Sequence, residues 1–483
     1  MSKQKTYSSV LKNTSIFGGV QVFTIIIGAL REKVVAILLG PIGIGTIGIL
    51  TSLITLISSL ISFGVPTSSV KYIAEKKGSK LKIIFIVRRI VLVTAILGLL
   101  TTILFANNIC FLIFGNHESS NIYSIMITGF AILFYGLENG ELSILQATRK
   151  IKQIAKARIY SSLIGLFFSL PIYYVWRIDG IAYSLVLIYL INCLVIFYYS
   201  ENYKFKQEKL KFKEFITESK GIITLGFFIT LSAIIMSLVN FITKSYVLSI
   251  GSITDLGYYE TGNKLVNGYV SLIFVAMAKD YFPRISAVNK NNTKIEEIAN
   301  TQIDIALLFL FPIIVFFSVS AEFILSVLYS SDFIIVKSYI IIAIIGLIFK
   351  LVSWTLSYII LAKGESLIFF LYEIFGGFIL LISNYLGFKY YGLQGLGAAF
   401  LIYNILYCII LLILNKIKFN IIIKFNLGLK LISFLIIISL IICINLFVIS
   451  NFILNIIIVI LSILSSIYQL NRRINLLKLI KKR

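Results

Sequence analysis

Long apolar runs, separated by short polar connections, occupy most of the 483-residue chain. A helix that crosses a bilayer needs about 20 mostly apolar residues, because each residue rises ~1.5 Å through a ~30 Å hydrocarbon core. The pattern therefore predicts an all-α polytopic membrane protein with about 14 transmembrane helices. The predicted segments are 13–39, 42–65, 83–106, 122–146, 159–176, 180–199, 221–249, 258–278, 303–328, 334–361, 367–387, 393–414, 429–449 and 452–470.

Two of the connections are hinges built on glycine. The first lies in LLGPIGIGTIGI (Leu38 to Ile49), and SIGSITDLGYYE (Ser249 to Glu260) is laid out in a similar way. Both helix pairs would start in the cytoplasm, so the repeat is parallel, which is a transporter architecture. The expected hinge residues are Gly40, Pro41, Gly43, Gly251 and Gly257.

This repeat divides the chain into two six-helix lobes related by a parallel pseudo-twofold axis, followed by a C-terminal helix pair. The expected domains are an N-lobe over 1–200 (helices 1–6) and a basic cytoplasmic linker over 201–220. A C-lobe over 221–420 (helices 7–12) and a C-terminal region over 421–483, with helices 13–14 and a basic tail, complete the chain.

The basic residues set the orientation of the helices. With the N-terminus in the cytoplasm, 36 of the 44 Lys and Arg residues lie on the cytoplasmic side, and only Arg177 and Lys389 lie in outer loops. This asymmetry follows the positive-inside rule and places both termini in the cytoplasm. It also explains the net charge of +24 as attraction to membrane lipids, so no nucleic-acid partner is expected.

Composition excludes several other classes. Hydrophobic residues make up 59% of the chain and charged residues 13%, against about 25% charged in soluble domains. The four cysteines lie in or beside apolar segments, and the only histidine is His117, so neither a metal site nor a catalytic triad is expected. The first apolar run continues too far for a cleavable signal peptide.

No energy-supplying or catalytic module is predicted either. The Walker pattern is absent, because GYYETGNK (Gly257 to Lys264) has Asn where the motif needs Lys. The outer loops are too short to hold an enzyme site, so the chain is expected not to be an enzyme and to carry no cofactor. Transport would be driven by an H⁺ or Na⁺ gradient, by membrane potential, by a substrate gradient or by a separate subunit.

Charged residues inside the apolar segments mark the expected site, because insertion of each costs about 2.5–3.5 kcal/mol at mid-bilayer. Arg31, Lys244 and Lys264 belong to the four helices of the repeat, and facing one cavity they would bind a phosphate or carboxylate. Structural alternatives exist: Lys264 has Glu260 at i−4, Lys244 is able to snorkel, and Glu32 adjoins Arg31.

Further polar residues extend this set. Lys350 and Glu373 are expected to pair with each other, or to take part in ion coupling. Glu138 and Glu141 are expected to pair with the cytoplasmic Arg149 and Lys152, with ion coupling as the alternative. Three tyrosines near Lys264 are candidate sugar contacts, although interfacial tyrosines are ordinary in membrane proteins. They are Tyr258, Tyr259 and Tyr269.

The N-terminal pattern, from NTSIFGGVQVF at Asn13 through LLGPIGIG to FGVPTSSVKYIAEKK at Lys77, resembles the Wzx-type O-antigen and polysaccharide flippases. These form part of the polysaccharide transporter family in the MOP superfamily. The resemblance implies two lobes around a central cavity lined by helices 1, 2, 7 and 8. It also implies that an undecaprenyl-diphosphate-linked oligosaccharide, an O-antigen or capsular repeat unit, is flipped to the outer leaflet by alternating access.

In the resemblance, Arg31 corresponds to the cationic helix-1 position of such cavities and Lys264 to the helix-8 position. The location implied is the bacterial cytoplasmic (inner) membrane, and the implied partners include a polymerase and glycosyltransferases of polysaccharide assembly. Two alternatives stay open. A lipid II flippase shares the prenyl diphosphate and has fourteen helices, whereas a MATE-like ion-coupled multidrug exporter would favour carboxylates over cations in its cavity.

Overall fold

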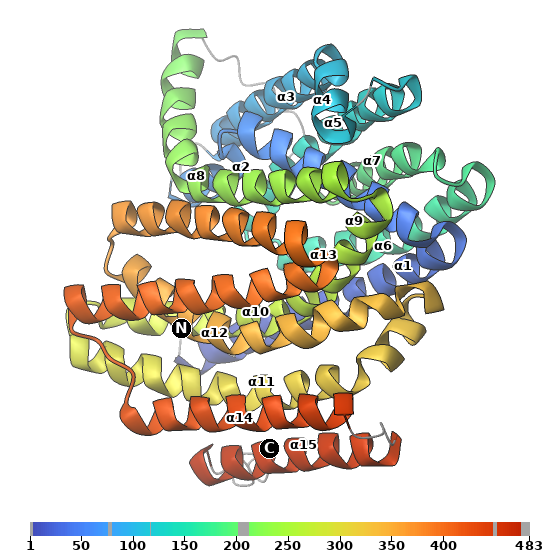
Figure 1. The fold of residues 1–483 in the computed structure, drawn as a ribbon. Coiled ribbons are helices and arrows are strands. Elements are labelled where there is room, and N and C mark those ends of the chain that lie inside the picture. Colours follow the sequence, from blue (N-terminus) through green and yellow to red (C-terminus); the bar gives the residue numbers. More distant parts are fainter. Residues whose placement is uncertain (1–2, 76–79, 116, 201–211, 448–451, 475–483) are drawn as a thin grey trace. The chain divides into compact units, whose positions relative to one another are not determined.

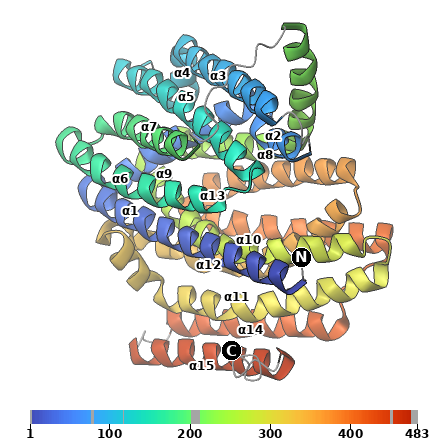
Figure 2. The same ribbon diagram turned by 180° about the vertical axis from the view of Figure 1, so that it is seen from behind.

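The computed structural model describes residues 3–75, 80–115, 117–200, 212–447 and 452–474, and every regular element within these ranges is helical (Figure 1). The same helices are seen from behind in Figure 2. The chain forms two compact units, Met1–Gly257 and Tyr258–Arg483. The predicted linker at 201–220 lies largely outside the described residues, and the helix that follows it packs with the first unit.

Unit 1 contains the first eight α-helices and the start of the ninth. They are α1 (Lys3–Ile61), α2 (Val65–Glu75), α3 (Lys80–Leu104), α4 (Ala106–Phe114), α5 (Ser119–Ala147), α6 (Ile151–Trp176), α7 (Gly180–Ser200), α8 (Phe212–Ile250) and α9 (Ile253–Asn263). Unit 2 continues with η2 (Lys264–Tyr269), α10 (Ser271–Ala287), α11 (Asn292–Leu328), η3 (Ser331–Val336), α12 (Lys337–Ala362), α13 (Ser366–Phe419), α14 (Phe425–Phe447) and α15 (Phe452–Ile474).

Eleven helices in the described ranges are long and apolar enough to cross a membrane, so the predicted count of fourteen is not confirmed. The difference arises at three places. Segments 13–39 and 42–65 form the single element α1, and segments 367–387 and 393–414 form the single element α13. Segment 258–278 is divided among α9, η2 and α10, and each of these is shorter than a span.

The element α1 contains a sharp turn at the predicted hinge. Gly40 has φ 62° and ψ −160°, a backbone region that is essentially restricted to glycine. A Cβ atom on Gly43 would lie 2.3 Å from Cβ of Leu39, although residues four apart in a regular helix hold these atoms about 5–6 Å apart. Two helices therefore meet here without a loop, and the predicted break at Gly40 and Pro41 is confirmed.

The element α13 turns in the same way at Gly392, where φ is 56° and ψ is −135°. A Cβ atom on Gly395 would lie 1.8 Å from the carbonyl oxygen of Gly387. Eight residues of straight helix would separate these two by about 12 Å, so the chain must reverse direction between them. Figure 1 shows the two arms of α13 lying side by side.

The two hairpins share the same glycine spacing. The predicted repeat paired Leu38–Ile49 with Ser249–Glu260 instead. Gly40, Gly43 and Gly45 are spaced like Gly392, Gly395 and Gly397. The third glycine of each set touches the backbone near the start of another helix. A Cβ on Gly45 would lie 2.2 Å from the Ile253 oxygen, and one on Gly397 would lie 2.8 Å from the Tyr339 oxygen.

Each unit is apolar on the outside as well as in its core. Ile49 and Leu351 are 0% exposed, whereas Leu104 and Ile417 are 76% and 80% exposed. A surface of this kind is stable when lipid tails replace water around it. Polar side chains instead turn inward, where they need partners, because an unsatisfied group in hydrocarbon is costly.

The predicted C-terminal helix pair packs on α11, as both ribbon views show for α14 and α15 (Figures 1 and 2). The Lys430 amine on α14 lies 2.8 Å from the Asp304 carboxylate on α11. Asn455 on α15 accepts a hydrogen bond from Asn445 and donates to the carbonyl of Val319. The Lys430–Asp304 ion pair and the hydrogen bond from Asn455 to Val319 therefore attach the helix pair to α11. The Asn445–Asn455 hydrogen bond joins the two helices to each other.

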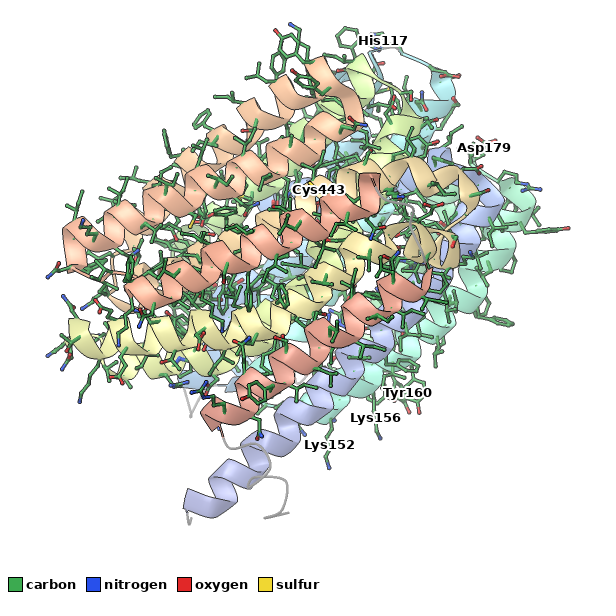
Figure 3. The ribbon with its side chains drawn as sticks, turned by 60° about the horizontal axis from the view of Figure 1, so that its bottom comes forward. His117, Lys152, Lys156, Tyr160, Asp179 and Cys443 are labelled. Atoms are coloured by element: carbon green, nitrogen blue, oxygen red, sulfur yellow. The ribbon has the colours of Figure 1, made fainter. Side chains whose placement is uncertain are left out.

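The two ends of α6 carry different polar residues. Lys152, Lys156 and Tyr160 follow one another at its basic end, and all three are exposed. Asp179, just beyond the other end, lies far from them (Figure 3). Of the four cysteines, only Cys443 is exposed rather than buried. Burial, together with the nearby Glu118 carboxylate, raises the pKa of the Cys110 thiol and keeps it protonated.

Candidate functional site

Two buried carboxylates on α5 organise the polar interior of unit 1. Glu141 is 2% exposed. It accepts hydrogen bonds from Nε and Nη2 of Arg88 on α3, at 2.6 and 2.8 Å, and one of 2.6 Å from the Ser200 hydroxyl on α7. This two-pronged arginine–carboxylate geometry is the strongest kind of side-chain ion pair. One carboxylate thereby joins three helices.

Glu138, one helical turn earlier, is 4% exposed and accepts a 2.8 Å hydrogen bond from Nη1 of Arg158 on α6. The predicted pairing of these two carboxylates with Arg149 and Lys152 is therefore wrong. Proximity in the sequence suggested that pairing. Helix packing instead brings arginines from α3 and α6 to α5. The spacing of residues in the sequence could not predict these partners.

Arg31 lies on α1 within this unit and is partly buried. No carboxylate of the described residues lies within ion-pair distance of its guanidinium. The Tyr189 phenol on α7 is within electrostatic range of both Arg31 and Glu138. Its ring meets that of Tyr135 edge-on at 5.3 Å. A cation with tyrosines beside it and no paired carboxylate is suited to binding an anion with attached hydroxyl groups.

Lys244 on α8 is the second predicted cation, and its amine donates a 3.3 Å hydrogen bond to the Gly48 carbonyl on α1. A second close contact with α1 occurs at the hinge, because a Cβ on Gly257 of α9 would lie 2.0 Å from the Pro41 carbonyl oxygen. Gly257 is thus required for close backbone contact. Gly251 follows the end of α8, where its N–H donates to the Val247 carbonyl.

Arg177 was expected only as an outer-loop charge, yet it supports the hinge. It lies in the turn between α6 and α7, and its Nη1 donates a 3.0 Å hydrogen bond to the Leu38 carbonyl. Leu38 is two residues before the turn at Gly40, where helical acceptors lose their usual partners and Pro41 has no N–H to offer. The signal that could have revealed this role is an arginine in a predicted outer turn, where Lys and Arg are otherwise nearly absent.

Lys264, the third predicted cation, is exposed and begins the π-helical turn η2 in unit 2. Such turns are rare and often occur at functional sites. Within the turn, Asn267 donates a 2.6 Å hydrogen bond to the Asn263 side chain and accepts one of 2.7 Å from the Lys350 amine on α12. The Lys350 amine also lies 5.9 Å from the Phe274 ring centroid.

The expected ion pair between Lys350 and Glu373 is not formed. Glu373 on α13 instead accepts a 2.7 Å hydrogen bond from the Tyr407 hydroxyl, while Lys350 takes Asn267. The Tyr407 ring is stacked against Tyr403 at 5.4 Å. The sequence identified both charged residues but could not give the rotations of α12 and α13, which decide what each side chain meets.

Two of the three candidate sugar-binding tyrosines have aromatic partners within unit 2. Tyr258 meets Phe333 edge-on at 5.9 Å, and Tyr259 meets Tyr339 edge-on at 6.0 Å. Tyr259 is only 7% exposed, so it has little surface left for a sugar. The side chain of Tyr269 lies outside the described residues.

The remaining predicted residues are partly buried on their helices, Glu32 beside Arg31 on α1 and Glu260 on α9. Their roles in pairing or ion coupling stay predictions. No group of three or more His, Cys, Asp or Glu side chains in the described ranges has the arrangement of a metal site.

Comparison with known proteins places this geometry in context. No curated protein sequence matches the chain. Among solved structures, the fold is similar to the lipid II flippase MurJ in an inward closed conformation, with TM-score 0.76 and 18% identity over 94% of this chain and 98% of that one. An inward-facing multidrug resistance MATE family transporter of the MOP superfamily gives TM-score 0.67 and 17% identity, over 82% and 94%.

A third similar structure is a MOP superfamily transporter from Pyrococcus furiosus, whose binding pocket is described as reversed in polarity. It gives TM-score 0.61 and 15% identity over 85% of this chain and 96% of that one. At these identities the likeness establishes the fold alone. The family model for polysaccharide biosynthesis proteins matches residues 34–338, and the chain therefore belongs to that family.

Proposed function

We propose that this protein is a flippase that carries an undecaprenyl-diphosphate-linked oligosaccharide from the cytoplasmic to the outer leaflet of the bacterial inner membrane. The observation that carries the proposal is Arg31, a partly buried cation on a membrane helix with no carboxylate at ion-pair distance in the described residues. Such a group is expensive to insert unless it serves a ligand. Membership of the polysaccharide biosynthesis family supports a glycan-bearing ligand.

In the proposed mechanism, the prenyl chain stays in the bilayer and the diphosphate binds Arg31, because a guanidinium offers paired N–H donors to phosphate oxygens. Lys244 on α8 contributes further positive charge from the same unit, and the glycan occupies a wet cavity beside these cations. The glycine hinge at Gly40 gives the first helix pair a point about which to rearrange during alternating access.

Deletion of the gene, followed by analysis of surface polysaccharide and lipid-linked intermediates, tests the proposal. We expect loss of surface glycan and accumulation of undecaprenyl-diphosphate repeat units on the cytoplasmic side. Complementation with Arg31→Ala should fail while the protein remains in the membrane, and Arg31→Lys should restore part of the export. Lys156→Ala, at an exposed cytoplasmic position, is the matched control and should complement fully.

The rival functions give different outcomes in the same strain. Intact glycan with new sensitivity to cationic drugs would indicate a multidrug exporter and would contradict the anion site at Arg31. A lipid II flippase is the second candidate, because a structure of one matches 94% of this chain. In that case depletion would stop peptidoglycan synthesis and cause lysis, with lipid II as the accumulating intermediate.

A further inference from the structure

The feature that the proposed mechanism leaves unused is the Lys350 amine in unit 2. Lys350 is partly buried on α12, within the membrane-spanning stretch Ser331–Ala362. Its contacts are the Asn267 amide oxygen at 2.7 Å and the Phe274 ring face at 5.9 Å. No carboxylate of the described residues lies within ion-pair distance of the amine. Among the described residues, its charge is therefore stabilised by neutral groups alone.

The direction of the hydrogen bonds follows from the lysine. An ammonium group can only donate, so the oxygen of Asn267 must face Lys350 and its nitrogen must face away. That nitrogen donates to Asn263, whose oxygen must therefore face inward as the acceptor. Each amide oxygen thus uses one of its two lone pairs within the cluster. What remains for a ligand is mostly N–H groups, those of Lys350, Asn267 and Asn263.

The local backbone holds these donors together. Asn267 lies in the π-helical turn Lys264–Tyr269, and Asn263 is the residue just before it. All three side chains of the cluster are partly rather than fully buried, so each keeps some accessible surface. A cluster that presents positive charge and more free donors than free acceptors is complementary to an oxyanion.

We propose that Lys350, Asn267 and Asn263 form an oxyanion site in unit 2 that binds a carboxylate or phosphate group of the transported molecule. This inference rests on the proposed function, and it adds a second anion-recognising group to Arg31. Two sources supply the same chemistry: the diphosphate of the lipid and an acidic sugar of the glycan.

Binding to the full-length protein in phosphatidylcholine nanodiscs tests the site, with four probes. They are undecaprenyl diphosphate, a trisaccharide with one glucuronate, the same trisaccharide with glucose in its place, and inorganic pyrophosphate. Lys350→Gln should weaken at least one of the anionic probes by tenfold or more, whereas Lys350→Arg should stay within about threefold of wild type. Lys389→Gln is the matched control, because Lys389 is a lysine of the same unit that lies over tyrosine rings.

Asn267→Asp separates a ligand site from a structural lysine. The new carboxylate would pair with Lys350, so the protein should be as stable as wild type or more stable, yet anion binding should fall like that of Lys350→Gln. The proposal is overturned if the anionic probes bind both variants as they bind wild type, if Lys350→Arg loses as much affinity as Lys350→Gln, or if no anionic probe binds wild type. The probe that loses affinity identifies the source of the oxyanion.

The two proposals fail separately. If Lys350→Gln binds and exports normally while Arg31→Ala does not export, the flippase stands and the unit 2 site is rejected. If surface glycan survives gene deletion, but the purified protein binds the glucuronate probe in a Lys350-dependent way, the site stands and the flippase is rejected.

Discussion

The two units contain the same kind of glycine hairpin, but the buried carboxylates on α5 in unit 1 and two mid-helix charges in unit 2 have different kinds of partner. In unit 1, Glu138 and Glu141 each have an arginine partner, at 2.8 and 2.6 Å. In the part of unit 2 that the structure describes, the mid-helix charges Lys350 and Glu373 have only neutral partners, an asparagine and a tyrosine. Paired charges of the first kind hold helices together. Charges of the second kind are available to interact with a ligand or an ion.

The largest effect is expected where a paired charge loses its partner. Arg88→Ala leaves Glu141 buried and uncompensated, which should lower the free energy of unfolding by about 3–5 kcal/mol. Detergent-driven unfolding of the purified protein measures this change. Lys337→Ala breaks an exposed pair with Glu322, and it should cost about 1 kcal/mol or less. Equal losses in the two variants would remove the distinction drawn for unit 1.

The shared hairpins give the next effect and a test of their equivalence. Gly40→Ala and Gly392→Ala each place a Cβ on a backbone conformation with φ near +60°, at a cost of about 1–3 kcal/mol. Because both glycines make the same turn, the two losses should agree within about 1 kcal/mol. Gly28→Ala serves as control, since nothing lies within 4 Å of its added Cβ. A cost at only one hairpin would show that the turns are not equivalent.

A smaller effect is expected at the outer turn of unit 1. Arg177→Ala removes the donor to the Leu38 carbonyl and should reduce stability by roughly 0.5–1.5 kcal/mol, the usual worth of one hydrogen bond. Faster hydrogen exchange should be confined to the residues around Gly40. Uniformly faster exchange across unit 1 would contradict a local role for Arg177.

The smallest effect on stability is expected at Lys350 in unit 2. Lys350→Met removes a cation that has no carboxylate partner, so the free energy of unfolding should change by less than about 1 kcal/mol or rise. Detergent-driven unfolding beside Arg88→Ala makes the contrast direct. A loss as large as that of Arg88→Ala would mean that Lys350 is a structural charge like those of unit 1.

The sequence was sufficient where a local rule decides the structure. The apolar segments, the turn at Gly40 and the docked C-terminal pair follow from segment length, glycine chemistry and hydrophobicity. The hydrogen-bond and ion-pair partners of the buried charges could not be predicted in this way. Glu138 takes Arg158, and Lys350 takes Asn267, because helix rotation and neighbour order bring them together. The π-helical turn at Lys264 was also missed, since one extra residue in a helical turn leaves no distinctive composition.

The hairpin turns at Gly40 and Gly392 also bear on how the protein enters the membrane. Lys389 and Gln394 flank the turn at Gly392, whereas the turn at Gly40 joins two apolar arms with no polar loop, so nothing hydrophilic has to cross the bilayer there. Both arms are then able to leave the insertion machinery sideways as a preformed pair. An epitope tag placed at Gly40 should therefore disturb biogenesis more than one placed beside Asp179, where the chain already exposes a polar turn.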